Sequence, residues 1–152
     1  MKRFGLRCVW TIGAAVLLVC CSSCGSGQRF YPVHGQVLAD GKPAEGVTVV
    51  LNPVEQPDPA HPLLPSAVVQ ADGSFDVKTF LLKERVLKDG APPGNYRITC
   101  VWYPHEFQIV PGMELPDKFH GKYANPETSG LQADVADKAN TLPPLHLETR
   151  KK

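Results

Sequence analysis

Apolar residues alternate with other residues in three stretches of the chain, and this period of two is typical of strands with one buried face. The stretches cover residues 47–52, 96–103 and 131–135. The second is the longest, and β-branched and aromatic residues are frequent in it, which favours a strand further. We therefore expect three strands here, with these residues facing a core: Val47, Val49, Leu51, Tyr96, Ile98, Cys100, Trp102, Leu131, Ala133 and Val135.

Turn residues stand between further apolar segments. Asp40 to Pro43 follows the apolar residues 33–38 and precedes the strand from Val47. Asp72-Gly73 separates residues 67–70 from residues 74–79, and glycine accepts the positive φ that a tight turn requires. The sequence therefore predicts a hairpin at each turn, and in the second hairpin we expect Phe75 and Val77 to point inward.

Three other segments depart from the strand pattern. Residues 80–88 contain good helix formers and predict a short helical turn. Residues 53–65 contain five prolines and predict a loop. Pro143-Pro144 interrupts the last apolar segment, which indicates an edge strand or a bulge there.

The first residues have the three parts of an export signal. Lys2, Arg3 and Arg7 precede an apolar run over residues 8–19, which small residues follow. The run is shorter than the roughly 20 residues of a transmembrane helix. Without the three basic residues the chain keeps 13 basic and 15 acidic side chains, so its charge does not favour binding to nucleic acid.

The end of this segment, VLLVCCSSCGSGQ over residues 16–28, resembles the lipobox of bacterial lipoproteins, in which a cysteine is acylated and becomes the mature N-terminus. Cys24 follows the small residues Ser22 and Ser23 and precedes Gly-Ser-Gly, a flexible tether. Cys21 is the alternative, because Leu18 stands three residues before it, although Cys20 beside the cut is unusual. We favour Cys24 as the site of lipid attachment.

This resemblance implies an exported protein that is anchored by lipid to a membrane of a bacterial cell envelope, on its periplasmic or cell-surface face. The partner at the anchor would be membrane lipid. The expected organisation is a signal peptide over residues 1–23, a tether over 24–31, one domain over 32–148 and a basic tail over 149–152. A zinc site or disulfide framework is disfavoured, because Cys100 alone lies beyond the N-terminal cysteines.

Several motifs of the remaining chain resemble the carboxypeptidase regulatory-like family. They are VHGQVLADGKPAEGVTVVLNP, QADGSFDVKT and DGAPPGNYRITCVWYP, with the turns and strand positions typical of that family. LPDKFHGKYANPETSGLQADV over residues 115–135 resembles the last part of short lipoproteins of planctomycete-type bacteria. The resemblance implies an all-β fold, a single transthyretin-like or immunoglobulin-like β-sandwich of about seven short, mainly antiparallel strands.

The same motifs consist mainly of turns and core positions, so they indicate a fold and not an activity. We expect a non-catalytic interaction or structural module, with no catalytic residue, metal or cofactor. The alternative is a metal-dependent enzyme, because some related sandwiches bind iron through two tyrosines and two histidines. In this chain the matching residue types are Tyr103, His105, His120 and Tyr123.

A possible contact surface lies after the longest predicted strand, where VWYPHEFQIVPGMEL is rich in apolar and aromatic residues. Tyr103, Phe107 and Ile109 are the candidate residues for contact with an envelope protein or a glycan. Alternatively, they cover one end of the sandwich. Cys100 lies in an alternating apolar run and is expected to be buried and unreactive.

Overall fold

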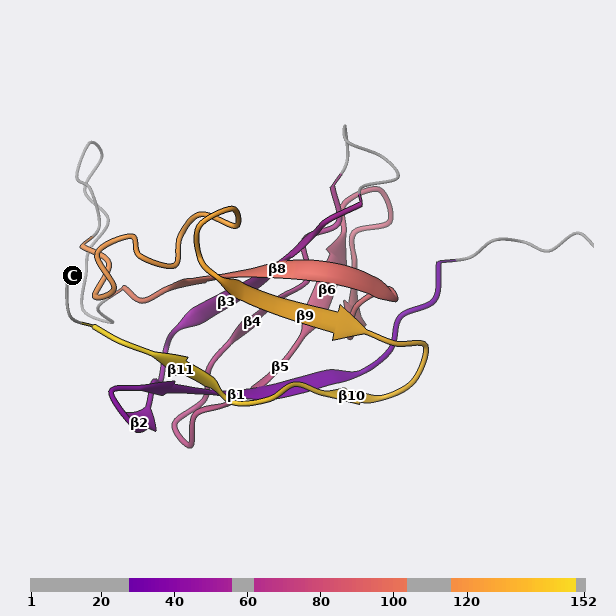
Figure 1. Cartoon of the computed structure of the whole chain (residues 1–152). Coiled ribbons are helices and arrows are strands. Elements are labelled where there is room, and N and C mark those ends of the chain that lie inside the picture. Colours follow the sequence, from indigo (N-terminus) through magenta and orange to yellow (C-terminus); the bar gives the residue numbers. More distant parts are fainter. Residues whose placement is uncertain (1–27, 56–61, 104–115, 150–152) are drawn as a thin grey trace, which may run out of the picture.

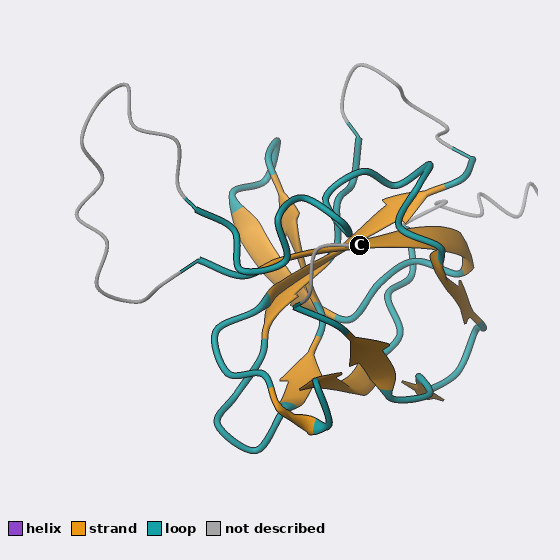
Figure 2. Ribbon diagram, turned by 60° about the vertical axis from the view of Figure 1, so that its left-hand side comes forward, coloured by secondary structure: helices purple, strands orange, loops and turns teal. Residues whose placement is uncertain are grey.

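The computed structural model describes residues 28–55, 62–103 and 116–149, and in these residues the chain forms two β-sheets and no helix (Figures 1 and 2). The two sheets pack against each other as a β-sandwich, as the sequence predicted. The strands are β1 Val33–Ala39, β2 Lys42–Pro43, β3 Thr48–Pro53, β4 Ser66–Val68, β5 Ser74–Asp76, β6 Lys78–Leu81, β7 Val86–Asp89, β8 Gly94–Val101, β9 Leu131–Val135, β10 Asn140–Thr141 and β11 Leu145–Leu147.

The first sheet has six strands in the order β7-β6-β4-β3-β8-β9, and all its neighbours are antiparallel. Its centre is the pair β3 and β8, in which Val49 lies opposite Cys100 and Leu51 opposite Ile98. All four side chains are buried. The alternation in the sequence therefore predicted the inward face of both strands correctly.

The second sheet is built around β1, which pairs with four short strands. β5 and β2 are antiparallel to it, whereas β10 and β11 run parallel to successive parts of it. Pro143 and Pro144 separate β10 from β11, since proline cannot donate to a ladder. Such short pieces explain why the described residues form eleven strands where the sequence predicted about seven.

The two predicted turns form, but neither joins the two strands that the sequence analysis expected to pair. Asp40 and Gly41, both with positive φ, make a two-residue turn between β1 and the short β2. The strand from Val47, β3, lies in the other sheet, so its expected pairing with residues 33–38 is wrong. At the second turn the expected pairing of residues 67–70 with residues 74–79 is also wrong. β5 leaves the sheet of β4 and pairs with β1 in the other sheet, although Phe75 and Val77 are buried as predicted.

The helical turn expected over residues 80–88 is also wrong. β6 and β7 form a hairpin there, with Phe80 opposite Leu87 and Leu81 opposite Val86. Helix propensity is a weak preference, and a segment of nine residues is too short for it to outweigh pairing with a sheet. β7 is the edge strand of the six-stranded sheet, and all four of its residues are exposed.

The described ends of the chain are attached to the sandwich. Tyr31, which we expected in the tether, pairs with Ala91 through two backbone hydrogen bonds of 2.9 and 3.0 Å. Thr149, expected in the tail, donates a hydrogen bond of 2.5 Å from its hydroxyl to the Asp40 carboxylate. The folded domain therefore extends at least one residue beyond the expected limits on each side.

Candidate functional site

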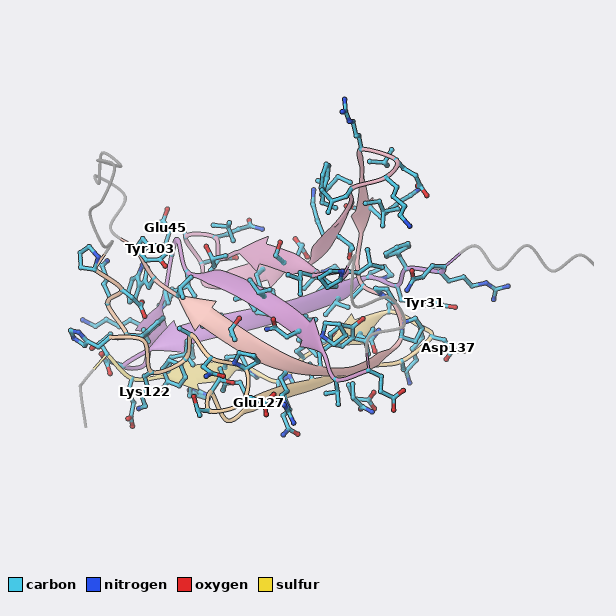
Figure 3. All side chains as sticks on the ribbon, turned by 90° about the horizontal axis from the view of Figure 1, so that it is seen from above. Tyr31, Glu45, Tyr103, Lys122, Glu127 and Asp137 are labelled. Atoms are coloured by element: carbon cyan, nitrogen blue, oxygen red, sulfur yellow. The ribbon has the colours of Figure 1, made fainter. Side chains whose placement is uncertain are left out.

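The described candidate contact residue, Tyr103, lies at one end of the sandwich. It lies two residues after the end of β8, and its side chain is exposed. Figure 3 shows Tyr103 at the same end as Glu45 and Lys122, whereas Tyr31 lies towards the opposite end of the molecule. The other candidates, Phe107 and Ile109, lie outside the described residues, as do the proposed lipid-attachment residues Cys21 and Cys24.

A cluster of three aromatic side chains packs at this end of the sandwich. The ring of Phe119 is buried and contacts Trp102 at 5.6 Å and Tyr123 at 5.4 Å between ring centroids. The ammonium group of Lys118 lies 4.0 Å from the centre of the Trp102 ring, within the range of a cation–π contact. Tyr103 is therefore presented next to a packed platform of aromatic side chains. The prediction that Trp102 packs inward is confirmed, since it contacts the core while remaining partly exposed.

The side chain of Asp117 joins Trp102, which precedes positions 104–115, to residues 119–121, which follow them. One of its carboxylate oxygens accepts hydrogen bonds from the backbone N–H groups of Trp102, at 2.9 Å, and Phe119, at 3.1 Å. The other oxygen accepts one from Gly121, also at 2.9 Å. In return the N–H of Lys118 donates to the carbonyl of Trp102 at 2.9 Å. Trp102 and residues 117–121, which lie on either side of positions 104–115 in the sequence, are thus held side by side.

The sequence analysis did not identify Asp117. Its bonds to N–H groups two and four residues later are typical of an aspartate that begins a turn, and Asp117 directly follows Pro116. That local signal predicts a turn. The bond to Trp102 joins residues 15 positions apart, and no local pattern contains it.

The iron-binding alternative receives no support from the described residues. The Tyr123 side chain is buried, and its hydroxyl accepts a hydrogen bond of 3.1 Å from the backbone N–H of Glu148. His120 is exposed, and His105 lies outside the described residues. In the part of the chain that the structure describes, no three His, Cys, Asp or Glu side chains are grouped so that they could hold a metal ion.

Cys100 is fully buried in β8, as the sequence predicted. Burial raises the pKa of its thiol to about 12, and the nearby negative charge of Asp117 acts in the same direction. Because the thiolate is the reactive form, this thiol remains protonated and unreactive near neutral pH. Cys100 thus behaves as a small core residue.

Cys100 is expected to resist a thiol reagent in the folded protein even at mildly alkaline pH, where a free cysteine with a pKa of about 8.5 would react. Ellman's reagent tests this directly. Unfolding in concentrated guanidinium chloride should expose one more thiol per chain. In the control variant Cys100→Ala this additional thiol should be missing after unfolding. In the folded state, the wild type and this variant should show the same number of reactive thiols. A fast reaction of Cys100 in the folded state would contradict its burial.

A cavity of about 440 Å³ lies beside β6 and the start of β8, and its size is typical of small-ligand sites. It is lined by the end of β6 and the following turn, including Phe80 and Leu82, and by residues 92–96. Gln28, the first described residue, also lines it. The hydroxyl of Tyr96 donates a 2.7 Å hydrogen bond to the carbonyl of Pro92, and burial raises the pKa of Tyr96 to about 12. Tyr96 is therefore a fixed, neutral part of the wall.

Comparison of the chain with models of known protein families gives no match, and comparison with curated proteins gives none either. The resemblance to the carboxypeptidase regulatory-like family therefore stays a prediction from the sequence motifs. The described part of the chain contains no helix that is long and apolar enough to cross a membrane.

Proposed function

We propose that the protein is a bacterial envelope lipoprotein whose β-sandwich is a non-catalytic interaction or structural module. The lipobox-like sequence around Cys24 supports the anchor. The sandwich supports the second part, because its described residues form one packed core between two sheets, and the exposed Tyr103 lies beside a fixed aromatic platform.

The observation that carries this proposal is the placement of the two ends. Tyr31, which pairs with the sandwich through Ala91, stands only seven residues after Cys24, and Tyr103 lies towards the other end of the sandwich (Figure 3). An anchor at Cys24 would therefore hold the Tyr31 end near the membrane. Tyr103 would face away from the membrane, where an envelope protein or a glycan can reach it.

Replacing Cys24 with alanine is expected to release the protein from membranes. Several acyl chains anchor a protein stably, so about nine tenths of the wild-type chain should sediment with membranes and only about a tenth of the variant. Fractionation of cells followed by immunodetection measures both values. Mass spectrometry of the mature N-terminal peptide should in addition find the acyl groups on Cys24.

Cys21→Ala is the matched control, because it changes the other candidate cysteine of the same segment. This variant is expected to remain with the membranes. If Cys21→Ala releases the protein and Cys24→Ala does not, the anchor is Cys21. If neither variant changes the distribution and no acyl group is found, the chain is not a lipoprotein of this kind.

A further inference from the structure

Exposed apolar side chains gather on the β6–β7 hairpin. The exposed fractions are 50% for Phe80, 66% for Leu82, 41% for Val86 and 55% for Leu87. Phe80 and Leu87 lie opposite each other in the ladder and share one face, whereas Val86 lies opposite Leu81 on the other. Clusters of exposed apolar residues are uncommon on soluble proteins and mark surfaces that contact another phase or molecule.

The same hairpin is basic. Residues 78–89 contain four basic and two acidic side chains, whereas the rest of the chain from Cys24 onwards contains nine basic and thirteen acidic ones. Lys83 and Arg85 lie in the turn that joins the two strands, and Lys88 lies in β7. Apolar residues flanked by lysine and arginine are typical of protein segments that lie in the interface of an anionic bilayer.

The hairpin lies near the first described residue of the chain, Gln28. Gln28 lines the same cavity as Phe80 and Leu82. Figure 1 likewise shows β6 in the same half of the molecule as the first described residues of the chain. Gln28 stands four positions after Cys24, and a chain of that length spans at most about 14 Å when fully extended. A lipid on Cys24 would therefore keep the hairpin close to the bilayer surface.

We propose that the β6–β7 hairpin contacts the membrane that holds the lipid anchor, with Phe80, Leu82 and Leu87 in the interfacial layer and its basic side chains at anionic headgroups. This inference rests on the proposed lipid anchor. The hairpin would act as a second attachment point and would fix the orientation of the sandwich, so that the end with Tyr103 points away from the bilayer.

An environment-sensitive fluorophore at position 87 tests this contact. The acylated protein carrying Leu87→Cys is labelled with a nitrobenzoxadiazole probe and reconstituted into vesicles of phosphatidylethanolamine and phosphatidylglycerol that contain a doxyl-labelled lipid as quencher. Cys100 does not compete for the label, because it is buried. We expect a blue shift of the emission and a loss of about half of the fluorescence, since the probe would lie in the interfacial layer.

Lys42→Cys is the matched control, because Lys42 is exposed in β2, on the other sheet. Its label should lose less than about a tenth of its fluorescence, because it would remain in water. Replacing phosphatidylglycerol by phosphatidylcholine should reduce quenching at position 87, because the basic side chains would lose their anionic partners.

Flotation of the vesicles separates failure of this inference from failure of the anchor. Protein that floats but shows equal, weak quenching at positions 87 and 42 overturns the hairpin contact and leaves the anchor in place. Protein that does not float contradicts both. A blue shift that needs no vesicles and grows with protein concentration would show that the exposed edge strand β7 pairs with a second copy, which also overturns the membrane contact.

Discussion

Gly90→Ala is expected to lower the free energy of unfolding by about 3–5 kcal/mol, because two costs add at this position. Gly90 has a φ of 89°, a conformation that residues with a side chain rarely adopt. A β-carbon there would also lie 1.9 Å from the carbonyl oxygen of Tyr31 and 2.4 Å from its carbonyl carbon. These are backbone atoms, so no flexible side chain can move aside.

The hydrogen bonds around Gly90 explain why this substitution would also disturb neighbouring residues. The N–H of Gly90 donates a hydrogen bond of 2.7 Å to the carbonyl of Val77. The carbonyl of Gly90 accepts a hydrogen bond of 2.6 Å from the buried hydroxyl of Thr79. The next residue, Ala91, forms the backbone bridge with Tyr31. Moving Gly90 to relieve the clash would disturb this bridge, through which the N-terminal segment joins the sandwich.

Gly41→Ala is the matched control. Gly41 has a similar φ of 79°, but a β-carbon there would have no neighbour within 4 Å. Only the backbone strain remains in Gly41→Ala, so its free energy of unfolding is expected to fall by about 1 kcal/mol. Urea denaturation followed by tryptophan fluorescence measures both values. Equal losses for the two variants would show that the close approach of Gly90 to Tyr31 is absent in solution.

Asp117→Ala is expected to lower the free energy of unfolding by about 2–4 kcal/mol, because three backbone N–H groups lose a charged acceptor. The variant should also loosen the end that presents Tyr103. Amide hydrogen exchange should therefore become faster at Trp102, Phe119 and Gly121, while the amides of β3 should change less. Urea denaturation and exchange measured by NMR test the two parts.

Two further variants make this prediction specific. Asp134→Ala removes an exposed carboxylate from β9 and should change the stability by less than about 0.5 kcal/mol. Asp117→Asn keeps one acceptor oxygen and should fall between the wild type and the alanine variant. If Asp117→Ala and Asp134→Ala prove equally mild, the hydrogen bonds of Asp117 do not hold this end of the sandwich together.

Part of the candidate site could be predicted from the sequence. Tyr103 ends the longest alternating stretch of the sequence, which indicated a place at the end of a sheet, and in the structure it lies exposed two residues after the end of β8. The burial of Cys100 followed from the same alternation. The link from Asp117 to Trp102 and the cavity beside Gln28 could not be predicted, because both join segments that are distant in the sequence.

By itself, the sequence determined which alternating segments form strands, the buried faces of β3 and β8, and the turns at Gly41 and Gly73. These features depend on local periodicity and on the conformational freedom of glycine, which are properties of a few neighbouring residues. Only the tertiary structure decided that β5 pairs with β1, and that residues 78–89 form a hairpin and not a helical turn. The choice of a strand's partner depends on which surfaces meet across the core, and a local pattern compatible with several partners contains no information about that choice.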